Sequence, residues 1–191
     1  MTDWRCFVAI PIGAELRQAL ARAVDGWKAA PPGDRLRWTD PETWHVTLAF
    51  LGSTEPDRVP DIERSLVEVA RGARAVECPT DGVGAFPSPN AARVVVYRVT
   101  DPDGSLGALA LAVRRALGVE HGGRFRPHVT LARTRGDGHE RLGEWVRTLR
   151  APSGLLAADR VELFRSHLGG GPARYESLSS IRLPKDEPIR A

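Results

Sequence analysis

Two short stretches of the sequence carry the same four residues, His-Val-Thr-Leu, beginning at His45 and at His128. With five histidines and ten threonines in the chain, about 0.26 His-x-Thr triplets are expected by chance, and two are found. Histidine titrates near neutral pH, so one imidazole can accept a proton while another donates one. The repeated segment therefore indicates a site that moves protons.

The threonine of each segment adds a second function. In a β-strand, residues i and i+2 share a face, so Thr47 stands beside His45 and Thr130 beside His128. Threonine hydroxyls donate hydrogen bonds to phosphate oxygens. Two such pairs facing each other across a cleft would hold one phosphate, with one histidine activating water and the other protonating the leaving oxygen. The pattern thus favours phosphodiester chemistry.

A zinc site is the competing interpretation, because histidine is a common metal ligand. Each segment supplies a single ligand, however, and no Cys, Asp or further His lies nearby in the sequence at a recognisable spacing. We therefore predict a site that needs neither metal nor cofactor. The remaining histidines, such as His139 and His167, receive no role.

The elements that must position these segments follow from hydrophobic periodicity. Strands are predicted at residues 5–10, 36–38, 45–51, 76–78, 82–86, 93–100, 128–133, 159–168 and 174–183, and the last two form a hairpin through the loop 169–172. Helices are predicted at residues 14–29, 57–71, 105–117 and 139–149. In the first His-Val-Thr-Leu strand, simple alternation places two groups on opposite faces: Val46, Leu48 and Phe50 on one, and His45, Thr47, Ala49 and Leu51 on the other.

Both halves of the chain share the order strand, helix, His-Val-Thr-Leu strand, helix, strand. This repetition predicts an α+β fold built as a bilobal duplicated unit, with two antiparallel sheets flanking a central cleft and helices on the outside. Residues 1–191 would form a single domain of two pseudo-symmetric lobes. Phe125, just before the second segment, is expected to line the cleft, where a base could stack on it.

Composition narrows the class of protein. The chain has 191 residues, 42% of them hydrophobic and 27% charged, as in globular domains. Cys6 and Cys78 show no disulfide or metal spacing, and no signal peptide or membrane span is recognisable, so we predict a cytoplasmic protein. No coiled coil or long apolar edge demands a partner, so we predict a monomer. The net charge of +3 is compatible with a polyanionic partner. Four arginines bracket His128: Arg124, Arg126, Arg133 and Arg135.

The paired segments resemble the HxTx motifs of the two-histidine (2H) phosphoesterase superfamily. The wider likeness is to its bacterial and archaeal RNA 2′,3′-cyclic phosphodiesterase branch, also called 2′-5′ RNA ligase-like. Further stretches that carry the likeness are residues 5–11, 44–52, 125–133, 163–166 and 173–176. Together they span nearly the whole chain.

The resemblance implies hydrolysis of a 2′,3′-cyclic phosphate at an RNA or nucleotide end to a 2′-phosphomonoester, without metal. It implies that His45 donates a proton to the departing 3′-oxygen and that His128 accepts a proton from water. By the same pattern the phosphate would be bound by Thr47, Thr130 and Arg133. The first segment has no matching arginine, since Phe50 occupies that offset.

Two other functions stay open from the sequence. The same two histidines could run the reverse reaction, which joins RNA ends through a 2′-5′ bond, and analysis of products at dilute and concentrated RNA separates the two directions. A non-catalytic module that holds RNA ends would instead bind with strong salt dependence and convert nothing.

Overall fold

The computed structural model describes residues 3–119, 124–136, 138–167 and 173–185. In the first half the regular elements are β1 (Trp4–Pro11), α1 (Ala14–Lys28), β2 (Arg37–Trp38), β3 (His45–Thr54), α2 (Val59–Arg71), β4 (Val76–Ser88) and β5 (Ala91–Val99). In the second half they are α3 (Ser105–Ala116), β6 (His128–Arg133), α4 (Gly143–Thr148), β7 (Leu155–Ala158), β8 (Arg160–His167) and β9 (Arg174–Arg182). Short 3-10 turns cover residues 33–35, 41–43 and 56–58.

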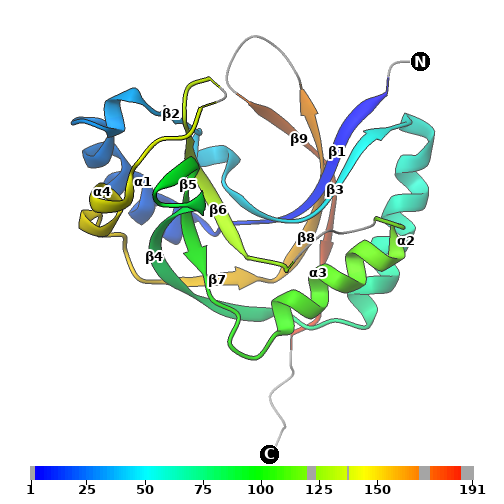
Figure 1. Cartoon of the computed structure of the whole chain (residues 1–191). Coiled ribbons are helices and arrows are strands. Elements are labelled where there is room, and N and C mark those ends of the chain that lie inside the picture. Colours follow the sequence, from blue (N-terminus) through cyan, green and yellow to red (C-terminus); the bar gives the residue numbers. More distant parts are fainter. Residues whose placement is uncertain (1–2, 120–123, 137, 168–172, 186–191) are drawn as a thin grey trace, which may run out of the picture.

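The strands form one strongly curled sheet in the order β7-β4-β5-β6-β3-β1-β8-β9, with β2 attached to β6 (Figure 1). Each neighbouring pair is antiparallel, and the two halves of the sheet meet where Val46 of β3 pairs with Val129 of β6. The predicted α+β class is confirmed. The two predicted sheets are the two halves of this sheet, β9-β8-β1-β3 and β6-β5-β4-β7.

The helices owe their positions to apolar stripes that repeat every three or four residues. On α2 the buried residues are Ile62, Leu66 and Ala70, and on α3 they are Leu106, Leu109, Ala110 and Val113. These two helices pack on each other, and α3 also packs on β3, in the lower right of Figure 1. Their stripes and one face of the sheet form the main hydrophobic core, so the opposite face of β3 and β6 stays free for chemistry.

Several predicted boundaries need correction. The segments at 76–78 and 82–86 are one continuous strand, β4, and α4 begins only at Gly143, where residue 139 was predicted. The strand β7 was not predicted at all, because Leu-Leu-Ala-Ala has no strand preference; its pairing with residues 76–79 of β4 creates it. The final hairpin is confirmed by the pairing of β8 with β9, and its loop lies outside the described residues.

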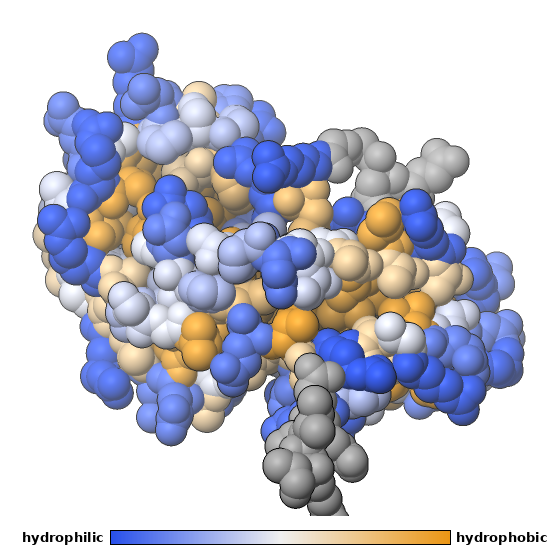
Figure 2. All heavy atoms as spheres, turned by 90° about the horizontal axis from the view of Figure 1, so that it is seen from below, coloured by the Kyte–Doolittle hydropathy of each residue, from blue (hydrophilic) through white to orange (hydrophobic). Residues whose placement is uncertain are grey.

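The surface carries hydrophilic and hydrophobic residues side by side. Seen from below, the molecule has hydrophilic residues around most of its outline and hydrophobic ones, interrupted by polar groups, toward the middle (Figure 2). Within the described ranges, none of the helices combines the length and the hydrophobicity that crossing a membrane requires.

Candidate active site at the junction of β3 and β6

His45 and His128 occupy the first positions of β3 and β6, the two strands that join the halves of the sheet. The valines that follow them are paired with each other and buried, whereas both histidines are only partly buried. Continuing this antiparallel register sets each histidine opposite the threonine of the other segment. The histidines are then diagonal neighbours on one face, with backbones about 7–8 Å apart. The structure therefore brings the two predicted histidines together.

Both imidazole rings are held in the same way. Nδ1 of His45 lies 2.6 Å from the carbonyl oxygen of Thr43, and Nδ1 of His128 lies 2.7 Å from that of Arg126. A carbonyl oxygen only accepts hydrogen bonds, so each Nδ1 carries a proton and donates it. In the neutral ring the lone pair is therefore on Nε2, which is the atom left to exchange protons with a ligand.

Aromatic side chains fix the rings from the side. The ring of Phe7 lies 4.8 Å from that of His45, and Tyr175 approaches the same imidazole edge-on at 5.4 Å. On the other strand, Phe86 meets His128 edge-on at 4.8 Å, and the Arg126 guanidinium covers Phe86 at 4.2 Å. Sequence reasoning gave Phe7 and Tyr175 no role, because nothing local shows which strands will flank a given histidine.

Burial and positive charge depress the basicity of both histidines. The pKa of His45 is lowered from 6.5 to about 4, chiefly by burial and to a smaller extent by the positive charges that His128 and Arg133 can carry. The pKa of His128 is also lowered, first by burial and then by Arg126 and Arg133. In the ligand-free protein this makes both imidazoles neutral at pH 7. A bound anion would oppose these effects and raise both pKa values.

A β-bulge in each strand decides which later residues share the face of the histidines. In the pairing of β3 with β1, Leu48 is an extra residue, since Val8 pairs with Ala49 and Ala9 with Thr47. An extra residue reverses the alternation of the side chains beyond it. The predicted alternation was therefore wrong beyond this point. Ala49 is buried in the main core, and the 66% exposed Phe50 lies on the histidine side, 6.3 Å from the Phe7 ring.

The same bulge in β6 explains the position of Arg133. Val95 of β5 pairs with Ala132 and Val96 with Thr130, so Leu131 is the extra residue. An offset of five would otherwise point Arg133 away from His128, but the bulge returns it to the same face. Its charge accordingly acts on the pKa of both histidines.

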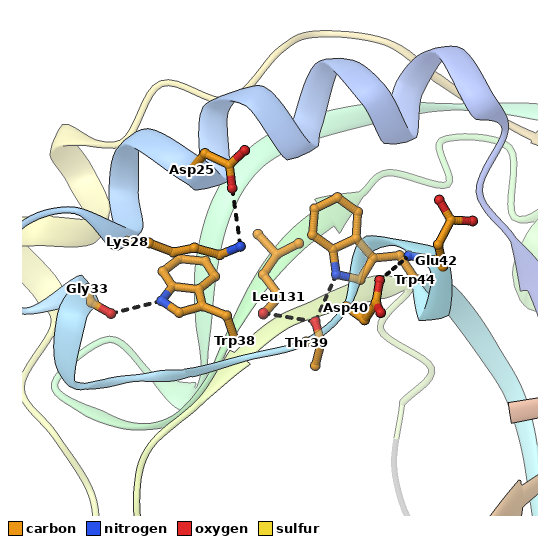
Figure 3. A network of polar contacts seen from close by, with 9 residues as sticks. All are labelled: Asp25, Lys28, Gly33, Trp38, Thr39, Asp40, Glu42, Trp44 and Leu131. Carbon is orange, nitrogen blue, oxygen red and sulfur yellow. Dashed lines mark hydrogen bonds and ion pairs between the residues drawn. The ribbon is translucent and has the colours of Figure 1, made fainter. Parts of the chain in front are cut away.

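Each bulged leucine carbonyl is bound from outside the sheet. The carbonyl of Leu131 accepts hydrogen bonds from the backbone N–H and the hydroxyl of Thr39, both at 2.9 Å. The Thr39 hydroxyl in turn accepts the indole N–H of buried Trp44 at 2.8 Å (Figure 3). On the other strand, Nε of Arg114 donates to the carbonyl of Leu48 at 2.6 Å. The hydrogen bonds of Thr39 thus connect the segment that precedes His45 to β6, the strand of His128.

The remaining predicted residues divide into two groups. Thr47 and Thr130 are partly buried beside the histidines, and in the described part of the chain neither hydroxyl has a hydrogen-bond partner, so both are available to a ligand. Phe125 instead packs against the main core, with the guanidinium of Arg114 of α3 over its ring at 5.0 Å. The structure therefore does not bring Phe125 together with the aromatic rings that contact the histidines.

A pocket of about 370 Å³ opens beside His45. Its walls combine aromatic, acidic and basic side chains: Phe164, Tyr175, Asp40, Glu42 and Arg174. The described residues contain no group of three or more His, Cys, Asp or Glu side chains placed to hold a metal ion. What surrounds the histidines is thus an aromatic and cationic environment next to a cavity large enough for a small ligand.

The sequence is similar to those of known proteins. The family model described as LigT like phosphoesterase matches residues 10–97. Among curated proteins named RNA 2′,3′-cyclic phosphodiesterase, that of Archaeoglobus fulgidus is 31% identical over 134 residues, 69% of this chain and 73% of that protein. That of Methanothermobacter thermautotrophicus is 28% identical over 188 residues, 94% of this chain and 98% of the other. That of Geobacillus stearothermophilus is 28% identical over 181 residues, which cover 93% of this chain but only 56% of the longer protein.

Solved structures share the fold. Protein TT0787 of Thermus thermophilus superimposes with a TM-score of 0.74 at 24% identity, covering 96% of this chain and 100% of that one. Escherichia coli LigT in complex with 3′-AMP gives a TM-score of 0.70 at 25% identity over 95% of this chain and 98% of that one. The family match, the curated relatives and the shared fold place this chain in the LigT-like phosphoesterase family of the 2H superfamily, as an enzyme of that family.

Proposed function

We propose that this enzyme opens 2′,3′-cyclic phosphates at RNA ends to 2′-phosphomonoesters, with the two histidines as its acid and base and without a metal ion. The observation that carries the proposal is the shared geometry of His45 and His128: both rings donate through Nδ1 to a backbone carbonyl and so leave Nε2 for proton transfer. The names of the curated relatives support the substrate class.

In the proposed reaction, the cyclic phosphate lies between the two imidazoles. Nε2 of His128 takes a proton from water as the water oxygen attacks phosphorus, and Nε2 of His45 gives a proton to the 3′-oxygen as its bond to phosphorus breaks. The hydroxyls of Thr47 and Thr130 and the guanidinium of Arg133 stabilise the charge that builds on the phosphoryl oxygens. The product keeps its phosphate on the 2′-oxygen.

The assignment of acid and base requires the substrate. Without ligand, the pKa of His45 is depressed to about 4, chiefly by burial, so that at pH 7 the ring lacks the proton that a general acid must give. A cyclic phosphodiester carries one negative charge, and placing that charge against the imidazolium raises its pKa. The proposal therefore predicts that His45 becomes protonated as the substrate binds.

The direct test uses a 2′,3′-cyclic mononucleotide and phosphorus NMR to identify the product. Replacing either histidine (His45→Ala or His128→Ala) should lower kcat by about 10²–10⁴-fold, the usual contribution of a general acid or base. His139→Ala, at an exposed histidine away from β3 and β6, is the matched control and should keep full activity. Full activity in both single variants, or loss of activity in EDTA that zinc restores, would refute the two-histidine mechanism.

The roles of the two histidines are separated with a substrate that has sulfur in place of the bridging 3′-oxygen. A thiolate leaves without being protonated, because thiols are far more acidic than alcohols; the cysteine thiol, for example, has a pKa of about 8.5. His45→Ala should then recover most of its activity, whereas His128→Ala should stay inactive. If only His128→Ala recovered activity on this substrate, His128 would be the acid and His45 the base.

A further inference from the structure

A second pocket, of about 440 Å³, is lined by residues of β4, β5 and α4 and by the segments that follow β4 and α4. Its lining contains three arginines, Arg98, Arg147 and Arg150, and one carboxylate, Asp81. The Arg98 guanidinium binds Asp81 twice: Nε donates to the backbone carbonyl of Asp81 at 2.7 Å, and Nη2 lies 3.2 Å from the Asp81 carboxylate. Within the described ranges, Arg147 and Arg150 have no carboxylate partner. The pocket therefore has an excess of two positive charges.

Arg98 connects this pocket with the histidine site. Arg98 of β5 pairs directly with His128 of β6, so the two side chains leave the same face of neighbouring strands. From there the Arg98 side chain crosses Gly84 of β4, where a β-carbon would come within 3.1 Å of Arg98 Cδ. Glycine at this position lets the arginine lie across the strand and reach the pocket edge. Arg126, which covers the Phe86 ring beside His128, adds another positive charge near the start of the path.

We propose that this pocket binds the phosphates on the 5′ side of the cyclic end, so that the preferred substrate is an RNA strand and not a free cyclic nucleotide. The inference rests on the proposed function. Guanidinium groups bind phosphate through paired N–H donors, and arginines along a groove follow the backbone of a single strand without reading its bases. A cyclic mononucleotide has no further phosphate and ends at the histidines, whereas an oligonucleotide continues over Arg98 to Arg147 and Arg150.

The test compares kcat/KM for a short oligonucleotide ending in a 2′,3′-cyclic phosphate with that for the cyclic mononucleotide. In the double variant Arg147→Gln/Arg150→Gln, the ratio should fall about tenfold, because each exposed ionic contact contributes a factor of about three. The matched control, Arg22→Gln/Arg58→Gln, removes the same charge from exposed positions on α1 and beside α2 and should leave the ratio unchanged. Asp81→Asn should change the ratio in the opposite direction, upward.

Binding gives an independent readout. The affinity of a labelled oligonucleotide with a 3′-phosphate, which cannot be hydrolysed by this route, is measured against salt concentration. Loss of two phosphate contacts should reduce the slope of log K against log salt by about 1.4 for a single strand. An unchanged ratio together with an unchanged slope would overturn the inference while leaving the proposed function intact. If the wild-type protein hydrolysed neither substrate, the proposed function would fail, and the salt slope would still decide whether the pocket binds RNA.

Discussion

Replacing Thr39 by valine tests whether the hydrogen bonds of its hydroxyl, which connect the segment before His45 to β6, stabilise the fold. Valine keeps the shape of threonine but has no hydroxyl, so the indole N–H of Trp44, now 2.8 Å from that hydroxyl, loses its acceptor (Figure 3). Trp44 is only 3% exposed, so water has little access to its indole N–H. A buried donor left without a partner costs about 1–3 kcal/mol. The hydroxyl also lies 2.9 Å from the carbonyls of Thr130 and Leu131, and of these the Leu131 carbonyl keeps the bond from the backbone N–H of Thr39.

The expected fall in unfolding free energy is therefore about 1–3 kcal/mol, which for a chain of this length lowers Tm by about 2–12 °C. Thr39→Ser is the matched control: it keeps the hydroxyl, loses one methyl group and should cost less than about 1 kcal/mol. Urea unfolding followed by tryptophan fluorescence gives the unfolding free energy of both variants, and thermal unfolding gives their Tm. The hydrogen bond from Trp44 to Thr39 also holds the turn whose Thr43 carbonyl binds His45. We therefore expect kcat to fall in Thr39→Val and to stay unchanged in Thr39→Ser. Equal stability of the two variants would refute this reasoning.

Two further predictions concern the site and its surroundings. In the ligand-free protein, an NMR titration should give His45 a midpoint near 4. This folded-state pKa lies below the unfolded value of 6.5, so the unfolded chain binds more protons between pH 4 and 6.5. The unfolding free energy should therefore fall as the pH drops from about 6.5 to 4. A titration midpoint at or above 6.5 would contradict the burial of the ring. Phe125→Ala should lower the unfolding free energy by about 1–2 kcal/mol, because Phe125 packs on the core and under Arg114. Its KM for a cyclic mononucleotide should stay unchanged, and a large rise in KM would instead support base stacking on this ring.

The histidine and threonine pairs could be read from the sequence because they depend on local geometry alone. Side chains two residues apart in a strand without a bulge share a face, so His45 and Thr47, and His128 and Thr130, were expected to lie together. The helices on the outside follow from stripes that are equally local, as in α2. The repeated order of elements also indicated that the two segments would meet, since equivalent strands of a duplicated unit occupy equivalent places.

Tertiary structure alone decided everything that depends on which strands become neighbours. The bulges at Leu48 and Leu131 exist only relative to the partner strands β1 and β5, and they place Phe50 and Arg133 on the side of the histidines. Contacts such as Thr39 with Leu131 join residues 92 positions apart, which no local pattern encodes. The depressed pKa of His45 likewise comes from burial by chain segments distant in sequence. Periodicity fixes the face of a side chain, whereas pairing across the sheet fixes its neighbours, its charge environment and therefore its chemistry.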